Sequence, residues 1–174
     1  MMILSIISAV LLFGYLLAMA CRHGIPDMVS DTYYQLGVKK GWLFTAVLTA
    51  SALMMMIAIL DSGRGIQSAA FIGTAGLIFV GFAPNYLSQD EYRIHKSAAI
   101  LSALGCVAWC LSANIYPTLI IATLYLLYHT AYTVRKSAEI PYWMPSIGSP
   151  WHPWYWAEVS CFADVFASYW IADL

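Results

Sequence analysis

The chain has 174 residues, of which 61% are hydrophobic and 10% are charged, and its mean hydropathy is +0.72. This composition lies outside the range of soluble domains and predicts an integral membrane protein. The net charge of −1 argues against a nucleic-acid partner, because nucleic-acid-binding proteins present basic surfaces.

Six apolar stretches are each about long enough to cross the hydrocarbon core of a bilayer as a helix. The connections between them are too short for a separate soluble domain. We therefore predict an all-α, polytopic membrane protein in which residues 1–174 form one six-helix transmembrane bundle. The predicted spans are residues 1–21, 42–60, 66–83, 97–113, 116–134 and 154–172.

The first stretch has no basic residue before its apolar run, so we expect it to be a membrane span and not a removed secretory signal. When the connections are assigned alternately to two sides, seven of the eight Lys and Arg residues fall on one side and only Arg64 falls on the other. The positive-inside rule makes the basic side cytoplasmic and places both termini outside. The sixth stretch contains Glu158, Asp164 and Asp173. If it only enters the interface, the C-terminus stays inside.

A polar, turn-rich segment, residues 24–34, follows the first span and contains Asp27, Ser30 and Asp31. Pro26 disfavours helix at Ile25, so the segment should begin in an extended conformation. The three polar side chains have two interpretations. They cap a turn by accepting backbone N–H bonds, or they present oxygen atoms to a lipid headgroup, a substrate or a metal.

Four more ionisable residues are candidates because of where they fall along the spans. His95 lies at the start of the fourth span, and His129 lies inside the fifth, about 9 Å below the basic surface. Glu158 lies near the start of the sixth span, and Asp164 lies near its middle. Because an ionised Asp is costly at that depth, Asp164 should be paired, protonated or facing water, and His129 is a candidate partner.

By depth, these four residues and the turn gather in the cytoplasmic half of the bundle and form one predicted ligand-binding cluster. Imidazole and carboxylate groups can hold zinc or perform acid–base chemistry, but no paired-His, nucleophile-elbow or phosphate-loop motif is present. No cofactor is predicted, with zinc as the one metal left open, and enzymatic activity is not the favoured interpretation. The cluster residues are Asp27, Ser30, Asp31, His95, His129, Glu158 and Asp164.

Four functions remain open at this point. The leading one is binding of a membrane lipid or a small polar ligand at the cytoplasmic-side cluster. The others are a metal-dependent membrane hydrolase, a proton-coupled transporter or channel that uses His129 and Asp164, and a purely structural membrane protein. The channel would be easiest to build as a homo-oligomer, because no internal repeat is visible.

Two further patterns concern packing and the membrane interface. Gly65, Gly73, Gly76 and Gly81 at the third span predict a close approach of a neighbouring helix. The connection over residues 137–153 is rich in Pro and Trp, which favours either a rigid interfacial lid or a plain aromatic belt.

Two short motifs carry a resemblance to a known group. The first is Ile25-Pro26-x-x-Val29-Ser30-Asp31-Thr32 after the first span, and the second is His95-x-x-x-Ala99 at the fourth. Together they resemble the DRAM and FGF-receptor-activating-protein group of six-span membrane proteins, and also small membrane proteins of gut bacteria and their phages. The resemblance implies the six-span fold and a bacterial inner (cytoplasmic) membrane, and it implies no chemistry. That group's loop is considered non-cytoplasmic, whereas the basic residues here predict the opposite side.

Overall fold

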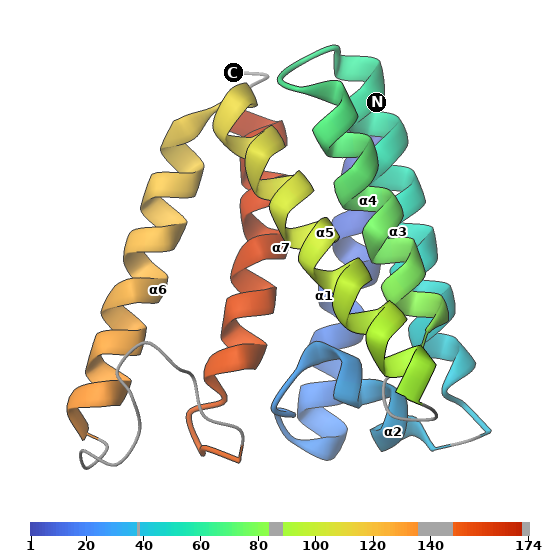
Figure 1. Cartoon of the computed structure of the whole chain (residues 1–174), viewed down its shortest axis with the longest axis vertical. Coiled ribbons are helices and arrows are strands. Elements are labelled where there is room, and N and C mark those ends of the chain that lie inside the picture. Colours follow the sequence, from blue (N-terminus) through green and yellow to red (C-terminus); the bar gives the residue numbers. More distant parts are fainter. Residues whose placement is uncertain (38, 84–88, 136–147, 172–174) are drawn as a thin grey trace.

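The computed structural model describes residues 1–37, 39–83, 89–135 and 148–171. Within these ranges the chain forms seven α-helices and one short 3₁₀ helix, η1, and contains no strand. Figure 1 shows their arrangement. The elements are α1 (Met2–His23), η1 (Val29–Asp31), α2 (Thr32–Leu36), α3 (Trp42–Ser62), α4 (Gln67–Phe82), α5 (Gln89–Ala113), α6 (Ile115–Arg135) and α7 (Pro153–Ile171).

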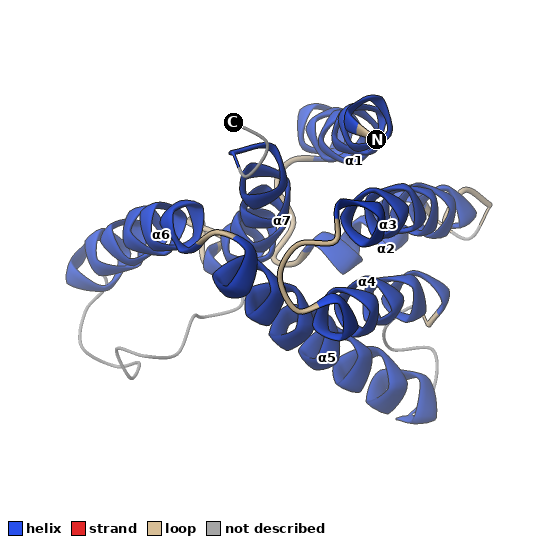
Figure 2. Cartoon of the chain, turned by 90° about the horizontal axis from the view of Figure 1, so that it is seen from above, coloured by secondary structure: helices blue, strands red, loops and turns tan. Residues whose placement is uncertain are grey.

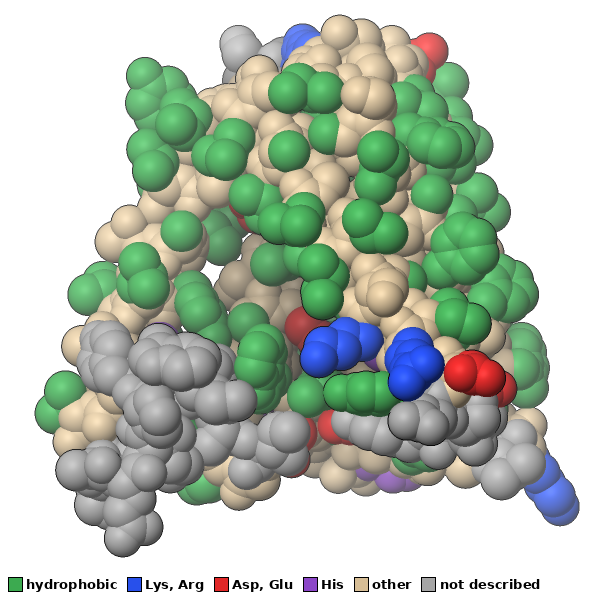
Figure 3. Space-filling model, viewed as in Figure 1, with side chains coloured by type: hydrophobic (Ala, Val, Ile, Leu, Met, Phe, Trp, Pro, Cys, Tyr) green, Lys and Arg blue, Asp and Glu red, His purple; other side chains and the backbone are tan. Residues whose placement is uncertain are grey.

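The six long helices run alternately down and up, so that both chain termini lie at the same end of the bundle (Figure 1). We call the opposite end, which carries η1 and α2, the basic end. Most of the Lys and Arg side chains visible in Figure 3 lie near it, and one lies at the end with the termini. Arg64 lies in the turn between α3 and α4, at the terminal end. The prediction assigned successive connections alternately to two sides, and in the fold they lie alternately at the two ends of the bundle.

Five of the six predicted spans coincide with a helix to within two residues at each end, and these helices are α1, α3, α4, α6 and α7. The exception is α5, which begins at Gln89 and not near Ser97. Asp90 and Glu91 lie in its first turn, where negative side chains stabilise the N-terminus of a helix. Hydropathy marks the end of the apolar run and not the end of the helix. His95 consequently lies on α5, one and a half turns from its start.

Three helices, α1, α3 and the part of α5 from Asp90 to Ala113, are long and apolar enough to cross a membrane. The helix α4 is apolar but has 16 residues, and α6 and α7, with 21 and 19 residues, fall below the hydropathy of these three. Large apolar side chains are exposed on the outer faces, for example Leu17, Phe79 and Leu104. Figure 3 shows such side chains spread over the upper two thirds of the visible face. Exposed apolar area of this extent is typical of a surface in contact with lipid.

The predicted close approach at the glycines is present and joins α4 to α5. A Cβ atom placed on Gly105 would lie 2.6 Å from the backbone nitrogen of Gly73, and one placed on Gly76 would lie 2.9 Å from the carbonyl oxygen of Ala98. The two backbones touch because these positions have no side chain. Figure 2 shows α4 between α3 and α5.

The remaining contacts leave a wedge-shaped opening. On the other side of the bundle, Ser8 of α1 donates to the Ser51 carbonyl of α3 at 2.8 Å. The helix α6 packs on α7 and α5 and is exposed around most of its circumference (Figure 2). Figure 1 shows α5 inclined to α7, so that the two helices separate toward the basic end. A cavity lies in this separation.

Candidate functional site

The cavity has a volume of about 310 Å³ and lies between η1, α3, α4, α5 and α7, toward the basic end. Its walls are mostly apolar, with Phe44 and Leu48 from α3 and Ile100 from α5 among them. In Figure 3 the surface is hollowed between α6 and α5, over α7, and acidic atoms lie in the lower part of the hollow. The polar lining residues are Ser30, His95, Ser102, Trp154, Glu158 and Cys161.

The turn after α1 is held by local hydrogen bonds that fix η1 over the end of this cavity. The Met28 N–H donates to Asp31 Oδ2 at 3.1 Å, which caps the turn in one of the two ways expected. The Thr32 hydroxyl donates to the Val29 carbonyl at 2.7 Å, and the Tyr15 hydroxyl of α1 donates to Thr32 Oγ1 at 2.8 Å. The turn is therefore tied both to itself and to the helix that precedes it.

Burial raises the pKa of the Asp31 carboxyl above its ordinary value. The hydrogen bond from the Met28 N–H opposes this shift, the charge of Asp27 adds to it, and His95 opposes it. Protonation of Asp31 therefore relieves a desolvated charge beside the cavity.

The polar end of the cavity joins η1 to α7. The Val29 N–H donates to Glu158 Oε2 at 2.6 Å, a contact between residues 129 positions apart in the chain. A backbone donor that bonds a carboxylate makes a strong, charge-assisted hydrogen bond. It holds Glu158 at the cavity wall and closes the end of the wedge between α5 and α7.

Ser30 and His95 add two further polar groups to this end. The Ser30 side chain is 6% exposed, and its hydroxyl oxygen has no hydrogen-bond partner among the described residues. His95 Nδ1 lies 2.8 Å from the Ala83 carbonyl oxygen. A carbonyl oxygen only accepts, so Nδ1 carries the proton, and in the neutral ring Nε2 is an acceptor.

A second, smaller cavity of about 50 Å³ lies deeper in the bundle. It shares Leu77, Ser102, Ala103, Cys161 and Phe162 with the first cavity, so the two are adjacent.

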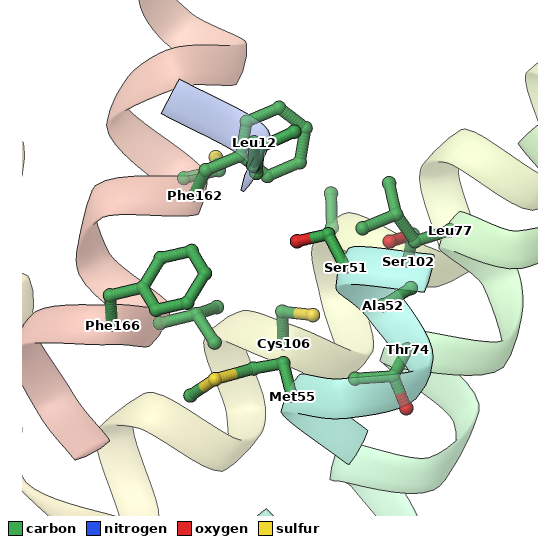
Figure 4. A pocket seen from close by; sticks show the side chains of 13 residues that line it. Leu12, Ser51, Ala52, Met55, Thr74, Leu77, Ser102, Cys106, Phe162 and Phe166 are labelled. Atoms are coloured by element: carbon green, nitrogen blue, oxygen red, sulfur yellow. The ribbon is translucent and has the colours of Figure 1, made fainter. Parts of the chain in front are cut away.

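Figure 4 shows the side chains of Phe162 and Phe166 from α7 facing Ser51 and Ala52 of α3 across the inner space. Ser51 Oγ is hydrogen-bonded to Ser8, so it does not need a hydrogen bond from a ligand in this space. The two spaces together form one site with a polar end near η1 and an apolar end inside the bundle.

The seven residues of the predicted cluster do not all meet at one place. Ser30, His95 and Glu158 line the same cavity, and Asp31 lies close enough to His95 and Glu158 to interact electrostatically with both. Asp27 is turned away. Its carboxylate accepts the Gly148 N–H at 2.8 Å and lies 3.4 Å from His152 Nδ1, which ties the first turn to the segment before α7.

The structure separates His129 from Asp164. Asp164 Oδ1 accepts hydrogen bonds from the Thr118 hydroxyl at 3.0 Å and from the Ser168 hydroxyl at 3.2 Å. Thr118 and His129 are eleven residues apart on α6, about 16 Å along the helix. His129 lies near the basic end beside the rings of Tyr125 and Tyr132, at centroid distances of 6.0 and 5.8 Å. Asp164 therefore lies nearer the terminal end of the bundle than we predicted when we placed it in the cytoplasmic-side cluster.

Ser102 and Cys161 line both cavities but were not candidates from the sequence. Serine and cysteine are ordinary residues inside membrane helices, and only the crossing of α5 and α7 brings these two together. Among the described residues, no group of three His, Cys, Asp or Glu side chains is placed to hold a metal ion. The predicted lid falls within residues 137–153, of which 137–147 lie outside the described residues.

No family model, no curated protein and no solved structure matches this chain.

Proposed function

We propose that the chain is a six-span protein of a bacterial inner membrane that binds an amphiphilic ligand, such as a membrane lipid, between α5 and α7. The ligand's polar head lies against Ser30, His95 and Glu158, and its apolar part extends toward the inner cavity. Two features support this arrangement: the space is mostly apolar with Ser30, His95 and Glu158 in its lining, and it continues into the bundle. Ligand sites commonly combine apolar walls with a few polar groups that converge on one point.

One observation carries the proposal, namely the hydroxyl of Ser30, a residue that lines the cavity. It is buried and has no partner in the described part of the chain, although buried hydroxyl groups are nearly always hydrogen-bonded. Such a group is expected where a ligand supplies the missing hydrogen bond.

Lipid that remains bound during purification tests the proposal. Ala99 lines the cavity, whereas Ala122 is exposed on α6. We expect wild-type protein to retain about one amphiphile per chain by mass spectrometry, the Ala99→Phe variant to lose it, and the Ala122→Phe variant to keep it. Equal retention in the two variants would place the bound lipid on the outer surface and refute the proposal.

The proposed orientation has its own test. Lys40 lies at the basic end and Arg64 at the terminal end. In cells, a membrane-impermeant thiol reagent should label Arg64→Cys from outside and leave Lys40→Cys unlabelled, in a background without the native cysteines. The reverse pattern would show that the basic end faces outward, against the positive-inside rule.

A further inference from the structure

The chemistry of the polar end restricts the ligand's head. The lining of the larger cavity contains no Lys or Arg among the described residues. Glu158 contributes a carboxylate, His95 contributes Nε2 as an acceptor in its neutral form, and Ser30 contributes a hydroxyl that is free to accept. The Val29 N–H, a backbone donor at this end of the cavity, is already used by Glu158.

The formal charge in the cavity lining is acidic, whereas the basic residues on either side of His95 in α5, Arg93 and Lys96, are exposed and are not part of the lining. Asp31 lies near Glu158 and adds a second carboxylate just outside the cavity wall. A phosphate or carboxylate head would meet Glu158 and Asp31 with like charge, and no Lys or Arg among the described lining residues would pair with it. A cationic head would pair with Glu158, whose charge is costly to hold in an apolar cavity without a partner.

The size of the space restricts the ligand's apolar part. A volume of about 310 Å³ is near the lower end of the range of roughly 300 to 1,000 Å³ for small-molecule sites. The inner cavity adds about 50 Å³. This space suits one alkyl chain better than the two chains of a glycerolipid.

We propose that the site binds a single-chain amphiphile with a primary ammonium head. An ammonium group has three N–H donors and no acceptor, which matches the three acceptors offered by Glu158, His95 and Ser30. This inference rests on the proposed function, because it names the head of the ligand that the cavity holds.

The test uses four probes with the same twelve-carbon chain: dodecylamine, dodecanol, dodecanoate and dodecyltrimethylammonium. Binding to delipidated full-length protein in nanodiscs is measured by tryptophan fluorescence, and the signal from Ala99→Phe is subtracted as partition into the bilayer. We expect dodecylamine to bind about tenfold or more tightly than dodecanol, since a charge-assisted hydrogen bond replaces a neutral one. The trimethylammonium probe, which has the charge but no N–H donor, should bind more weakly than dodecylamine.

Two variants and a control identify the groups responsible. Glu158→Gln keeps an acceptor for the Val29 N–H, so the turn should stay in place while the preference for dodecylamine over dodecanol disappears. Ser30→Ala should weaken dodecylamine binding severalfold. Asp61→Asn removes one negative charge at the far end of α3 and should leave the preference unchanged.

Failure of this inference is distinguishable from failure of the proposed function. If dodecanol binds as tightly as dodecylamine and Ala99→Phe abolishes both signals, the cavity binds amphiphiles but the ammonium assignment is wrong. If dodecanoate binds most tightly, the assignment is also wrong. If no probe gives a signal that Ala99→Phe removes, neither proposal survives.

Discussion

Replacing Ser30 with alanine should make the ligand-free protein more stable. A buried hydroxyl without a partner costs about 1 to 3 kcal/mol, and alanine removes the hydroxyl without leaving another group unpaired. We take the lower end of that range. About 1 kcal/mol corresponds to a rise of about 2 to 4 °C in the melting temperature of a protein of this size.

Ser8 provides a matched control, since it is also buried but its hydroxyl donates to the Ser51 carbonyl at 2.8 Å. Ser8→Ala should lower stability by about 0.6 kcal/mol, the average for hydrogen bonds between membrane helices. The assay is thermal unfolding of delipidated protein in detergent, followed by tryptophan fluorescence. If Ser30→Ala lowers the melting temperature as Ser8→Ala does, the Ser30 hydroxyl has a partner in the free protein and the argument for a ligand there fails.

Three further predictions concern helix packing, the buried aspartate and pH. Gly105→Ala should destabilise the bundle by about 1 to 3 kcal/mol, because its Cβ would lie 2.6 Å from a backbone nitrogen, whereas Gly14→Ala, with nothing within 4 Å, should be neutral or stabilising in thermal unfolding. Thr118→Val should cost about 0.6 kcal/mol by removing a donor to Asp164, and a change below 0.2 kcal/mol would mean that this bond does not form. The raised pKa of Asp31 means that the folded state binds its proton more tightly than the unfolded state, so stability should fall as pH rises from the unfolded pKa of about 4 through the folded pKa. The difference between wild type and Asp31→Asn across that pH range isolates this contribution, and an unchanged difference would contradict it.

The six long helices could be predicted because each contains an apolar run. For α3 the bounds differ by only two residues, since 42–60 was expected and Trp42–Ser62 is found. The short helix α2 (Thr32–Leu36) was not predicted, because it contains no such run. The start of α5 was missed because its first two turns are polar. Acidic side chains stabilise the N-terminus of a helix, so the end of the apolar run does not mark the start of α5.

The candidate site divides in the same way. Depth along the spans placed Ser30, His95 and Glu158 near one another, and the structure has them around one cavity. The predicted pairing of Asp164 with His129 was wrong, because Asp164 bonds Thr118 instead. Counting residues gives the depth of a side chain within its own helix but not the position of α7 relative to α6 along the bundle axis. The cavity itself depends on the angle between α5 and α7, which follows from packing and has no local signature in the sequence.

The bond between the Val29 N–H and Glu158 has a consequence for the order of assembly. At about 5 to 20 residues per second, the 129 residues that separate the two partners take roughly 6 to 26 s to synthesise. During that interval the first turn has been synthesised but has no carboxylate to bond. The polar end of the cavity is therefore completed only when α7 arrives, and a nascent chain arrested before Pro153 would contain α1 to α6 without a closed binding site.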